Sequence, residues 1–175
     1  MTPVSALIRI GKDVERHWRV LDVGCRDGAQ YTEWFVSKGC NVTGIDIKNY
    51  SDDCSKKGFQ FILTSLEDYR PDSRCDVVLA MNVLPFLKCS WDERMAHLTR
   101  LMLPGALLLL TVFTPDNGFK GDADVTTIGA DELRDLLQRH HLKVRYKCHE
   151  QYEGPTYEGT VKAWSVIGVV AELAA

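Results

Sequence analysis

Short apolar runs alternate with amphipathic segments along the chain, and the first repeat spans residues 18–46. An apolar run at 20–23 leads into a glycine turn, then a segment whose aromatic residues have helical spacing, then a second apolar run ending on Asp46. Strand, glycine turn, helix, strand and acid in this order are typical of a nucleotide-binding βαβ unit. The glycines let the backbone approach a ligand, the helix start offers free N–H groups, and Asp46 is placed to accept both ribose hydroxyls.

The later pattern continues the alternation. Apolar runs predict three more buried strands, at residues 59–63, 76–81 and 106–113. Apolar spacing predicts helices at residues 3–17, 90–102 and 129–140, and the polar stretch 48–57 is expected to form one or two helical turns between the first and second of them. Ser90 followed by Glu93 is a capping box for the helix at 90–102. Only about ten residues separate the third and fourth strands, which leaves hardly any room for a crossover helix there.

The spacing of the glycines distinguishes between two nucleotide-binding motifs. A dinucleotide fingerprint needs glycines at the first, third and sixth positions of the turn, but Arg26 and Ala29 occupy the last two when Gly24 is the first. The alternative template places an acid two residues before the first glycine and another glycine four residues beyond it. Asp22, Gly24 and Gly28 fit that template. A carboxylate at Asp22 suits a ligand that carries an ammonium group better than it suits a pyrophosphate.

Two motifs resemble those of the class I S-adenosylmethionine-dependent methyltransferases. LDVGCRDG at 21–28 resembles the family's first motif, LDxGCGxG, with Arg26 replacing the middle glycine. LPGALLL at 103–109 resembles the family's LKPGGxLLL, with Ala106 replacing the second glycine. The resemblance runs over roughly residues 18–173. VLPFL at 83–87, DELRDLL at 131–137 and the tail are similar to the small tellurite-resistance (TehB-like) branch.

The tail adds an argument about fold that does not depend on the glycines. Strands are predicted at 142–150 and within 161–173, and the roughly ten residues between them are too few for a crossover helix, so the two strands should be antiparallel. We therefore predict a single-domain α/β protein with the Rossmann-like class I methyltransferase fold. It has a seven-stranded, mostly parallel sheet with an antiparallel C-terminal strand and helices on both faces. Residues 1–17 form a leading helix, and residues 18–175 form the core.

The resemblance implies S-adenosylmethionine as cofactor, with S-adenosylhomocysteine as product. The implied cofactor residues are Asp22, Gly24, Cys25, Arg26, Gly28, Asp46, Ile47, Ser65, Leu66 and Ala80. In the family an acid after the third strand commonly accepts a hydrogen bond from adenine. Ser65 stands at that place, and Glu67 or Asp68 could substitute if the loop is re-set.

The acceptor side has weaker candidates. Asn82 follows the fourth strand and either orients a substrate nucleophile or caps the next helix. The hairpin loop at 151–159 lacks the histidine and arginines of the TehB-like branch, which disfavours an oxyanion acceptor. Tyr152, Glu153 and Tyr157 in that loop suit a neutral or cationic small molecule and are candidate general bases, unless they are merely packed and solvated.

Length, charge and cysteine content limit the kinds of partner and compartment that we expect for this chain. The chain has 175 residues, enough for one domain with a proper core, and its net charge of −3 argues against a nucleic-acid-binding face. Six cysteines without a C-x-x-C pair, and no signal peptide at the start, predict reduced thiols in the cytoplasm. The longest apolar run, 106–113, is too short to span a membrane. We expect no metal site, although Cys25 and Cys89 could both lie near the cofactor, and either a monomer or a homodimer.

A second hypothesis belongs to another class of function. With Arg26, Ser65 and Ala106 replacing usual family residues, the chain could be a catalytically degenerate methyltransferase fold that acts as a protein-binding module. Such a module predicts an exposed apolar patch on the sheet edge or hairpin. The enzyme predicts an open cofactor cleft at 24–28.

Overall fold

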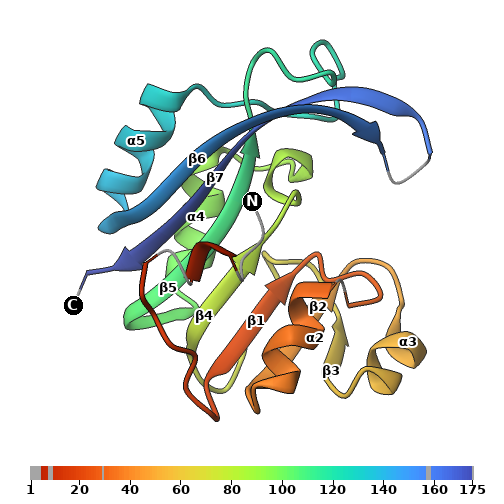
Figure 1. Cartoon of the computed structure of the whole chain (residues 1–175), viewed down its shortest axis with the longest axis vertical. Coiled ribbons are helices and arrows are strands. Elements are labelled where there is room, and N and C mark those ends of the chain that lie inside the picture. Colours follow the sequence, from red (N-terminus) through yellow and green to blue (C-terminus); the bar gives the residue numbers. More distant parts are fainter. Residues whose placement is uncertain (1–4, 8–9, 29, 157–158, 175) are drawn as a thin grey trace.

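The computed structural model describes residues 5–7, 10–28, 30–156 and 159–174. Its strands are β1 (Arg19–Val23), β2 (Asn41–Asp46), β3 (Gln60–Leu63), β4 (Cys75–Ala80), β5 (Met102–Phe113), β6 (Leu142–Pro155) and β7 (Val161–Leu173). They form one seven-stranded sheet in the order β3-β2-β1-β4-β5-β7-β6 (Figure 1). β7 runs antiparallel to both of its neighbours, and the pairs among β1 to β5 are parallel. The predicted fold, including the antiparallel strand near the C-terminus, is confirmed.

Helices cover both faces of the sheet (Figure 1). They are α2 (Gln30–Ser37), α3 (Ser51–Lys56), α4 (Trp91–Thr99) and α5 (Ala130–Arg139), with a short 3-10 turn, η1 (Leu84–Phe86). Strands β4 and β5 are buried on both faces, so their side chains alternate between two apolar layers. The strands position the site because the carboxyl ends of β1, β2, β4 and β5 meet at one edge of the sheet.

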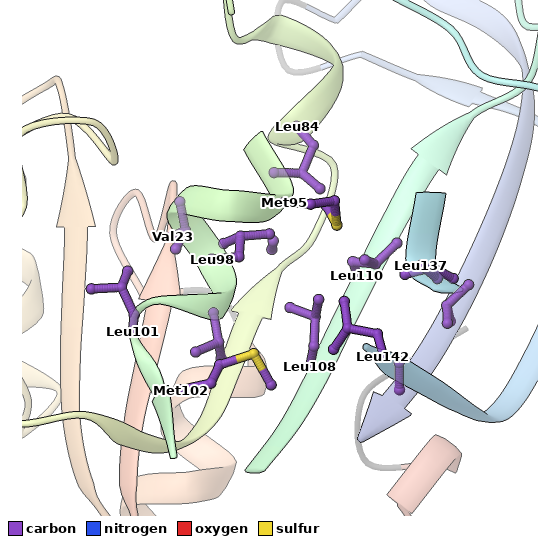
Figure 2. Packing of buried hydrophobic residues seen from close by; sticks show 14 of the residues in the cluster. Val23, Leu84, Met95, Leu98, Leu101, Met102, Leu108, Leu110, Leu137 and Leu142 are labelled. Atoms are coloured by element: carbon purple, nitrogen blue, oxygen red, sulfur yellow. The ribbon is translucent and has the colours of Figure 1, made fainter. Parts of the chain in front are cut away.

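The larger apolar layer lies between the sheet and helices α4 and α5. Figure 2 shows Met95 and Leu98 of α4 and Leu137 of α5 around Leu108 and Leu110 of β5. The opposite layer contains the alternate β5 residues, Leu107 and Leu109, together with Phe35 of α2 and Leu7 of the N-terminal segment. Two dry layers back to back hold the middle of the sheet rigid.

The leading helix is shorter than predicted. Ser5–Leu7 is helical, and backbone bonds from Ile10 to Ala6 and from Lys12 to Leu7 close it, whereas residues 12–15 are not helical. Other residues of the predicted segment, 3–4 and 8–9, lie outside the described ranges. Ala6 and Leu7 are buried against the sheet, so the short helix is a packing element of the α2 face.

Three boundaries differ from the predictions. α4 ends at Thr99, not at residue 102, and the expected Pro-Gly turn is an irregularity within β5. There β5 advances five residues while β4 advances two, between the pairs Cys75–Met102 and Val77–Leu107. β6 continues to Pro155, so residues 151–155 are strand and the hairpin connection is only 156–160. As predicted, residues 64–74 between β3 and β4 contain no helix.

The predicted capping box at the start of α4 is present. The Ser90 hydroxyl accepts from the Glu93 amide, and the Glu93 carboxylate accepts from the Ser90 amide at 2.8 Å. We expect Ser90→Ala to lower the free energy of unfolding by about 1 kcal/mol, because it removes an N-cap. Urea denaturation followed by circular dichroism measures it. Ser55→Ala, at an exposed position of α3, is the control and should cause little change; equal effects of the two variants would contradict the assignment.

Candidate cofactor-binding site

The glycine loop joins β1 to α2 and is fastened to the end of β2. The amides of Gly24 and Cys25 both donate to the Ile45 carbonyl, at 2.8 and 3.2 Å. Gly24 and Gly28 have φ angles of 70° and 76°, a region that favours glycine. A Cβ at Gly24 would lie 2.6 Å from Val83. A Cβ at Gly28 would overlap the ring of Phe59. Both glycines are therefore required by the turn itself and by side chains packed against it.

Helix α3 supports the loop from the side. The Cys54 thiol donates to the Arg26 carbonyl at 3.3 Å, and the Lys57 ammonium donates to the Gly28 carbonyl at 3.0 Å. Lys57 also pairs with Asp27 and with Glu33 of α2. Sequence reasoning did not single out Cys54 or Lys57, because nothing in the pattern of the 48–57 segment links it to the turn thirty residues earlier.

Asp46 ends β2 with its carboxylate oriented by two backbone amides. Arg26 N–H donates to Oδ2 at 3.0 Å and Lys48 N–H donates to Oδ1 at 2.9 Å. The side chain is half-buried, and each oxygen keeps a second lone pair. The group can accept hydrogen bonds from two neighbouring hydroxyls, as a ribose presents them. The position predicted for Asp46 fits a nucleoside.

Asp22 lies near the end of β1, just before the glycine loop. Its side chain is 5% exposed, and the Thr32 hydroxyl of α2 donates to it. Burial raises the pKa of Asp22 to about 7, the Thr32 hydrogen bond opposes this rise, and the Asp46 charge adds to it. A buried carboxylate with one short neutral donor favours a cationic ligand, since an ammonium would compensate the desolvation of its charge.

Arg26 occupies the position of the usual middle glycine and has φ of 51°. Arg26 therefore has a left-handed backbone conformation although it carries a Cβ. This conformation costs about 1–2 kcal/mol for an L-residue. In this conformation the Arg26 backbone N–H donates to the Asp46 carboxylate. The guanidinium side chain is exposed at the outer surface of the loop.

The turn after β3 differs from the expectation for adenine. The Ser65 hydroxyl accepts from the Asp68 amide and donates to the Asp68 carboxylate at 2.9 Å, so it closes its own turn. Leu66 is 3% exposed and belongs to the core, and its carbonyl accepts from Arg100 Nη2 at 3.1 Å. Ile47 and Leu63, at the ends of β2 and β3, are 75% and 57% exposed. They offer the apolar surface that a base requires; Leu63 was not predicted.

The end of β4 presents one polar group. Ala80 is fully buried, and Asn82, two residues later, is exposed with φ of 55°. The backbone N–H of Asn82 donates to the buried hydroxyl of Thr111 at 2.6 Å, and that hydroxyl donates to Asn82 Oδ1 at 2.7 Å. Asn82 does not cap η1, whose N-cap is Val83 without a side-chain bond. Thr111 is the one polar residue within the apolar run 106–113, and that position could have indicated a buried partner for Asn82, which was not predicted from the sequence.

The hairpin candidates lie elsewhere. Tyr152 and Glu153 are adjacent residues of β6, not loop residues, so they point to opposite faces of the sheet. Tyr152 stacks on Trp164 of β7, with ring centroids 6.1 Å apart, beside a cluster formed by Phe113, Phe119 and Phe86. Burial raises the pKa of Tyr152, with further contributions from Glu150 and Tyr31, so at neutral pH it is a hydrogen-bond donor and a poor base. Tyr157 lies outside the described residues.

The thiol pair considered from the sequence is not formed. Cys25 is buried and donates to the Arg26 carbonyl, with Cys54 as its thiol neighbour, whereas Cys89 contacts Glu67. Burial and the surrounding carboxylates raise the pKa of Cys25, which keeps it an unreactive thiol. Among the described residues, no three His, Cys, Asp or Glu side chains are grouped to hold a metal ion. No helix in the same ranges is both long and apolar enough to cross a bilayer.

The fold and this constellation define the class as the S-adenosylmethionine-dependent methyltransferases. The chain belongs to the methyltransferase domain family, which matches residues 3–158. It is 26% identical over 128 residues to malonyl-(acyl-carrier protein) O-methyltransferase 2 of Ilyobacter polytropus, covering 69% of this chain and 49% of that protein. The chain thus spans about half the length of this curated relative.

Solved structures with the same fold agree with this assignment. A methyltransferase from Methanosarcina mazei superposes with a TM-score of 0.77 at 17% identity, over 99% of this chain and 98% of that one. N-methyltransferase NodS from Bradyrhizobium japonicum gives 0.73 at 16% identity, over 98% and 94%. TehB from Haemophilus influenzae gives 0.73 at 16% identity, over 97% and 60%, so this chain shares the fold of a tellurite-resistance protein as it shares that of NodS. NodS is also known with S-adenosylhomocysteine bound, and the cofactor of the class is S-adenosylmethionine.

Arg26→Gly should raise the free energy of unfolding by about 1 kcal/mol, because glycine adopts a φ of 51° without the steric cost that arginine bears. Urea denaturation measures the change. Lys48→Gly is the matched control at an exposed position nearby, where φ is not positive and glycine should destabilise. Destabilisation by both substitutions would contradict the strain at Arg26.

Asp22→Asn tests the buried carboxyl through the pH dependence of stability. The folded protein keeps a proton on Asp22 up to about pH 7, whereas the unfolded chain releases it near the ordinary pKa of 3.8. The stabilisation of the fold by protonated Asp22 is therefore complete below pH 3.8. It decreases as the pH rises from there and is lost once the pH has passed about 7. From pH 5 to pH 8, the unfolding free energy of the variant should gain roughly 2 to 3 kcal/mol relative to the unmodified chain.

Urea denaturation across that pH range measures the difference. Thr32→Val removes the hydrogen bond that opposes the shift, so the same transition should move to higher pH in that variant. A difference between Asp22→Asn and the unmodified chain that does not change with pH would contradict the raised pKa.

Proposed function

We propose that this chain transfers a methyl group from S-adenosylmethionine to a small-molecule acceptor. The observation that carries the proposal is the Asp46 carboxylate, oriented by the Arg26 and Lys48 amides beside the glycine loop. In this proposal Asp46 accepts the ribose hydroxyls, and Asp22 faces the ammonium of the methionine portion. Ile47 and Leu63 flank the adenine ring, whose polar edge meets the backbone of the turn that begins at Ser65.

Bound S-adenosylmethionine supplies a methyl group on a sulfonium that is already a strong electrophile. The protein's contribution is then to position the acceptor in line with that methyl and to exclude water. Asn82 is placed for this, since Thr111 holds its Oδ1 and its Nδ2 has no partner among the described residues.

The acceptor in this proposal is a nucleophile that needs little help in losing its proton. Tyr152 stays protonated at neutral pH, and Glu153 is exposed on the opposite face of β6. Neither is a strong general base at the end of β4. A neutral amine or a thiol, on a molecule that is neutral or carries a positive charge elsewhere, therefore fits better than an unactivated hydroxyl. Its lone pair forms the new bond to the methyl carbon while the carbon–sulfur bond breaks and sulfur takes the electron pair of that bond, and the acceptor's proton goes to solvent.

A protein-binding role without transfer is the second candidate, and it requires an exposed apolar patch on the hairpin or sheet edge. Val161 and Tyr152 at the hairpin are 65% and 47% exposed, and Val144 of β6 is 40% exposed. The register of β6 with β7 places Tyr152 and Val161 on opposite faces of the sheet, and Val144 lies toward the other end of β6, so these side chains do not form one patch and the transferase is favoured.

Calorimetric titration with S-adenosylmethionine and, separately, S-adenosylhomocysteine tests the cofactor site. We expect micromolar binding with the product at least as tight, and Asp46→Ala should weaken both by about 1–3 kcal/mol, roughly 5- to 150-fold, through the lost ribose bonds.

Asp52→Ala, an exposed acid at the start of α3, is the matched control and should bind like the unmodified chain. Thermal unfolding of each variant verifies that the fold is retained. Absence of heat with either ligand from the folded, unmodified chain would overturn the proposal and leave the protein-binding role in its place.

A further inference from the structure

The short connection between β3 and β4 leaves a cavity of about 340 Å³ on the face of the sheet that α4 covers. The cavity is lined by Tyr69, Arg70, Pro71, Asp72, Ser73, Arg74, Arg100 and Leu101. Three of these residues are arginines and one is a carboxylate, in a chain whose net charge is −3. The cavity is therefore a local concentration of positive charge, separate from every residue assigned to the cofactor.

Two of the arginines are fixed in place. Arg70 Nη1 donates to the carbonyls of Glu67 and Tyr69, at 2.6 and 2.9 Å. Arg100 Nη2 donates to the same two carbonyls and to that of Leu66, at 3.1 to 3.3 Å. Both guanidinium groups thus converge on one short stretch of backbone. Burial lowers the pKa of Arg100, and the neighbouring charge of Arg70 lowers it further.

The donors of this cluster exceed its acceptors. The Nε of Arg100 is buried and has no hydrogen-bond partner in the part of the chain that is described. Within the same ranges, Arg74 makes no hydrogen bond or ion pair, and Asp72 pairs with none of the three arginines. Like charges close together are unfavourable, and an anion among these arginines would offset their mutual repulsion.

We propose that this cavity binds a phosphorylated small molecule. Guanidinium groups recognise phosphate oxygens through paired N–H donors, and fixed guanidinium groups lose little entropy on binding. The volume exceeds what inorganic phosphate fills, since a water molecule occupies about 30 Å³ of liquid. Buried Tyr69 and Leu101 form an apolar wall beside the arginines, and Figure 2 shows Leu101 at the margin of the core. Phosphate at the arginines with an apolar group against this wall uses the whole cavity.

The test is a titration of the intact chain with phenyl phosphate and with inorganic phosphate, read by calorimetry and by thermal unfolding. Potassium chloride at matched ionic strength is the reference for general screening of charge. We expect saturable binding of phenyl phosphate, at least tenfold tighter than that of inorganic phosphate. Equal binding of the two would overturn the organic part of the proposal and reduce the site to one for free phosphate.

Arg74→Gln should weaken phenyl phosphate binding at least tenfold without loss of stability, because Arg74 is exposed and unpaired in the described ranges. Arg145→Gln, on edge strand β6 where Arg145 pairs with Glu172, is the matched control and should bind normally. A response reproduced by potassium chloride, or unchanged in Arg74→Gln, would overturn the site. Titration of Arg74→Gln with S-adenosylhomocysteine keeps the two proposals distinguishable, since the cofactor site contains none of these arginines.

Discussion

The hydrogen bonds from the Arg26 and Lys48 amides to the Asp46 carboxylate are the constraint on which the site depends. They join the loop after β1 to the end of β2, and the bonds from Gly24 and Cys25 to the Ile45 carbonyl hold the same junction from the other side. With both ends of the loop fixed on the rigid middle of the sheet, the acid does not need to reorganise when hydroxyls approach. Binding then costs less conformational entropy than it would at a mobile loop.

The junction is built at some cost to stability. Arg26 keeps a backbone conformation that only glycine adopts freely, and Asp22 keeps a carboxyl where burial raises its pKa to about 7. Asn82 repeats the pattern at the end of β4, with φ of 55° and its side chain held by a buried threonine. His17 and His141, which lie outside the site, also have positive φ, so the left-handed backbone alone does not mark a binding site. What distinguishes this sheet edge is that the left-handed backbone of Arg26 and Asn82 occurs together with the poorly solvated carboxyl of Asp22.

Much of the fold could be predicted because its signals are local. The apolar runs, the capping box at Ser90 and the short tail connection each lie within about a dozen residues of sequence, and the structure confirms them. The length of β6 could not be predicted, because residues 151–155 become strand only by pairing with β7. The Pro-Gly irregularity of β5 depends in the same way on its register with β4.

In the candidate site too, residues within one motif could be predicted, whereas their partners from distant parts of the sequence could not. The glycines and acids of the first motif could be predicted since motif spacing reflects backbone geometry. The partners that hold them could not, because Thr32, Lys57 and Thr111 come from other elements and are ordinary residues in their own segments. The hydrogen bonds between Ser65 and Asp68, three residues later, could not be predicted either, because only the turn geometry decides them.

The missing crossover helix between β3 and β4 links the two proposed sites. A helix there would bury the back of the turn at 65–69 with apolar side chains, whereas here Arg70 and Arg100 satisfy its carbonyls. The turn therefore has the proposed adenine on one side and a cationic cavity on the other. Hydrogen bonds to charged donors are stronger than neutral ones, so two arginines can order a turn that lacks a helix. The same two arginines, together with Arg74, line the cavity that the short connection leaves open, so the groups that order the turn also make the cavity cationic.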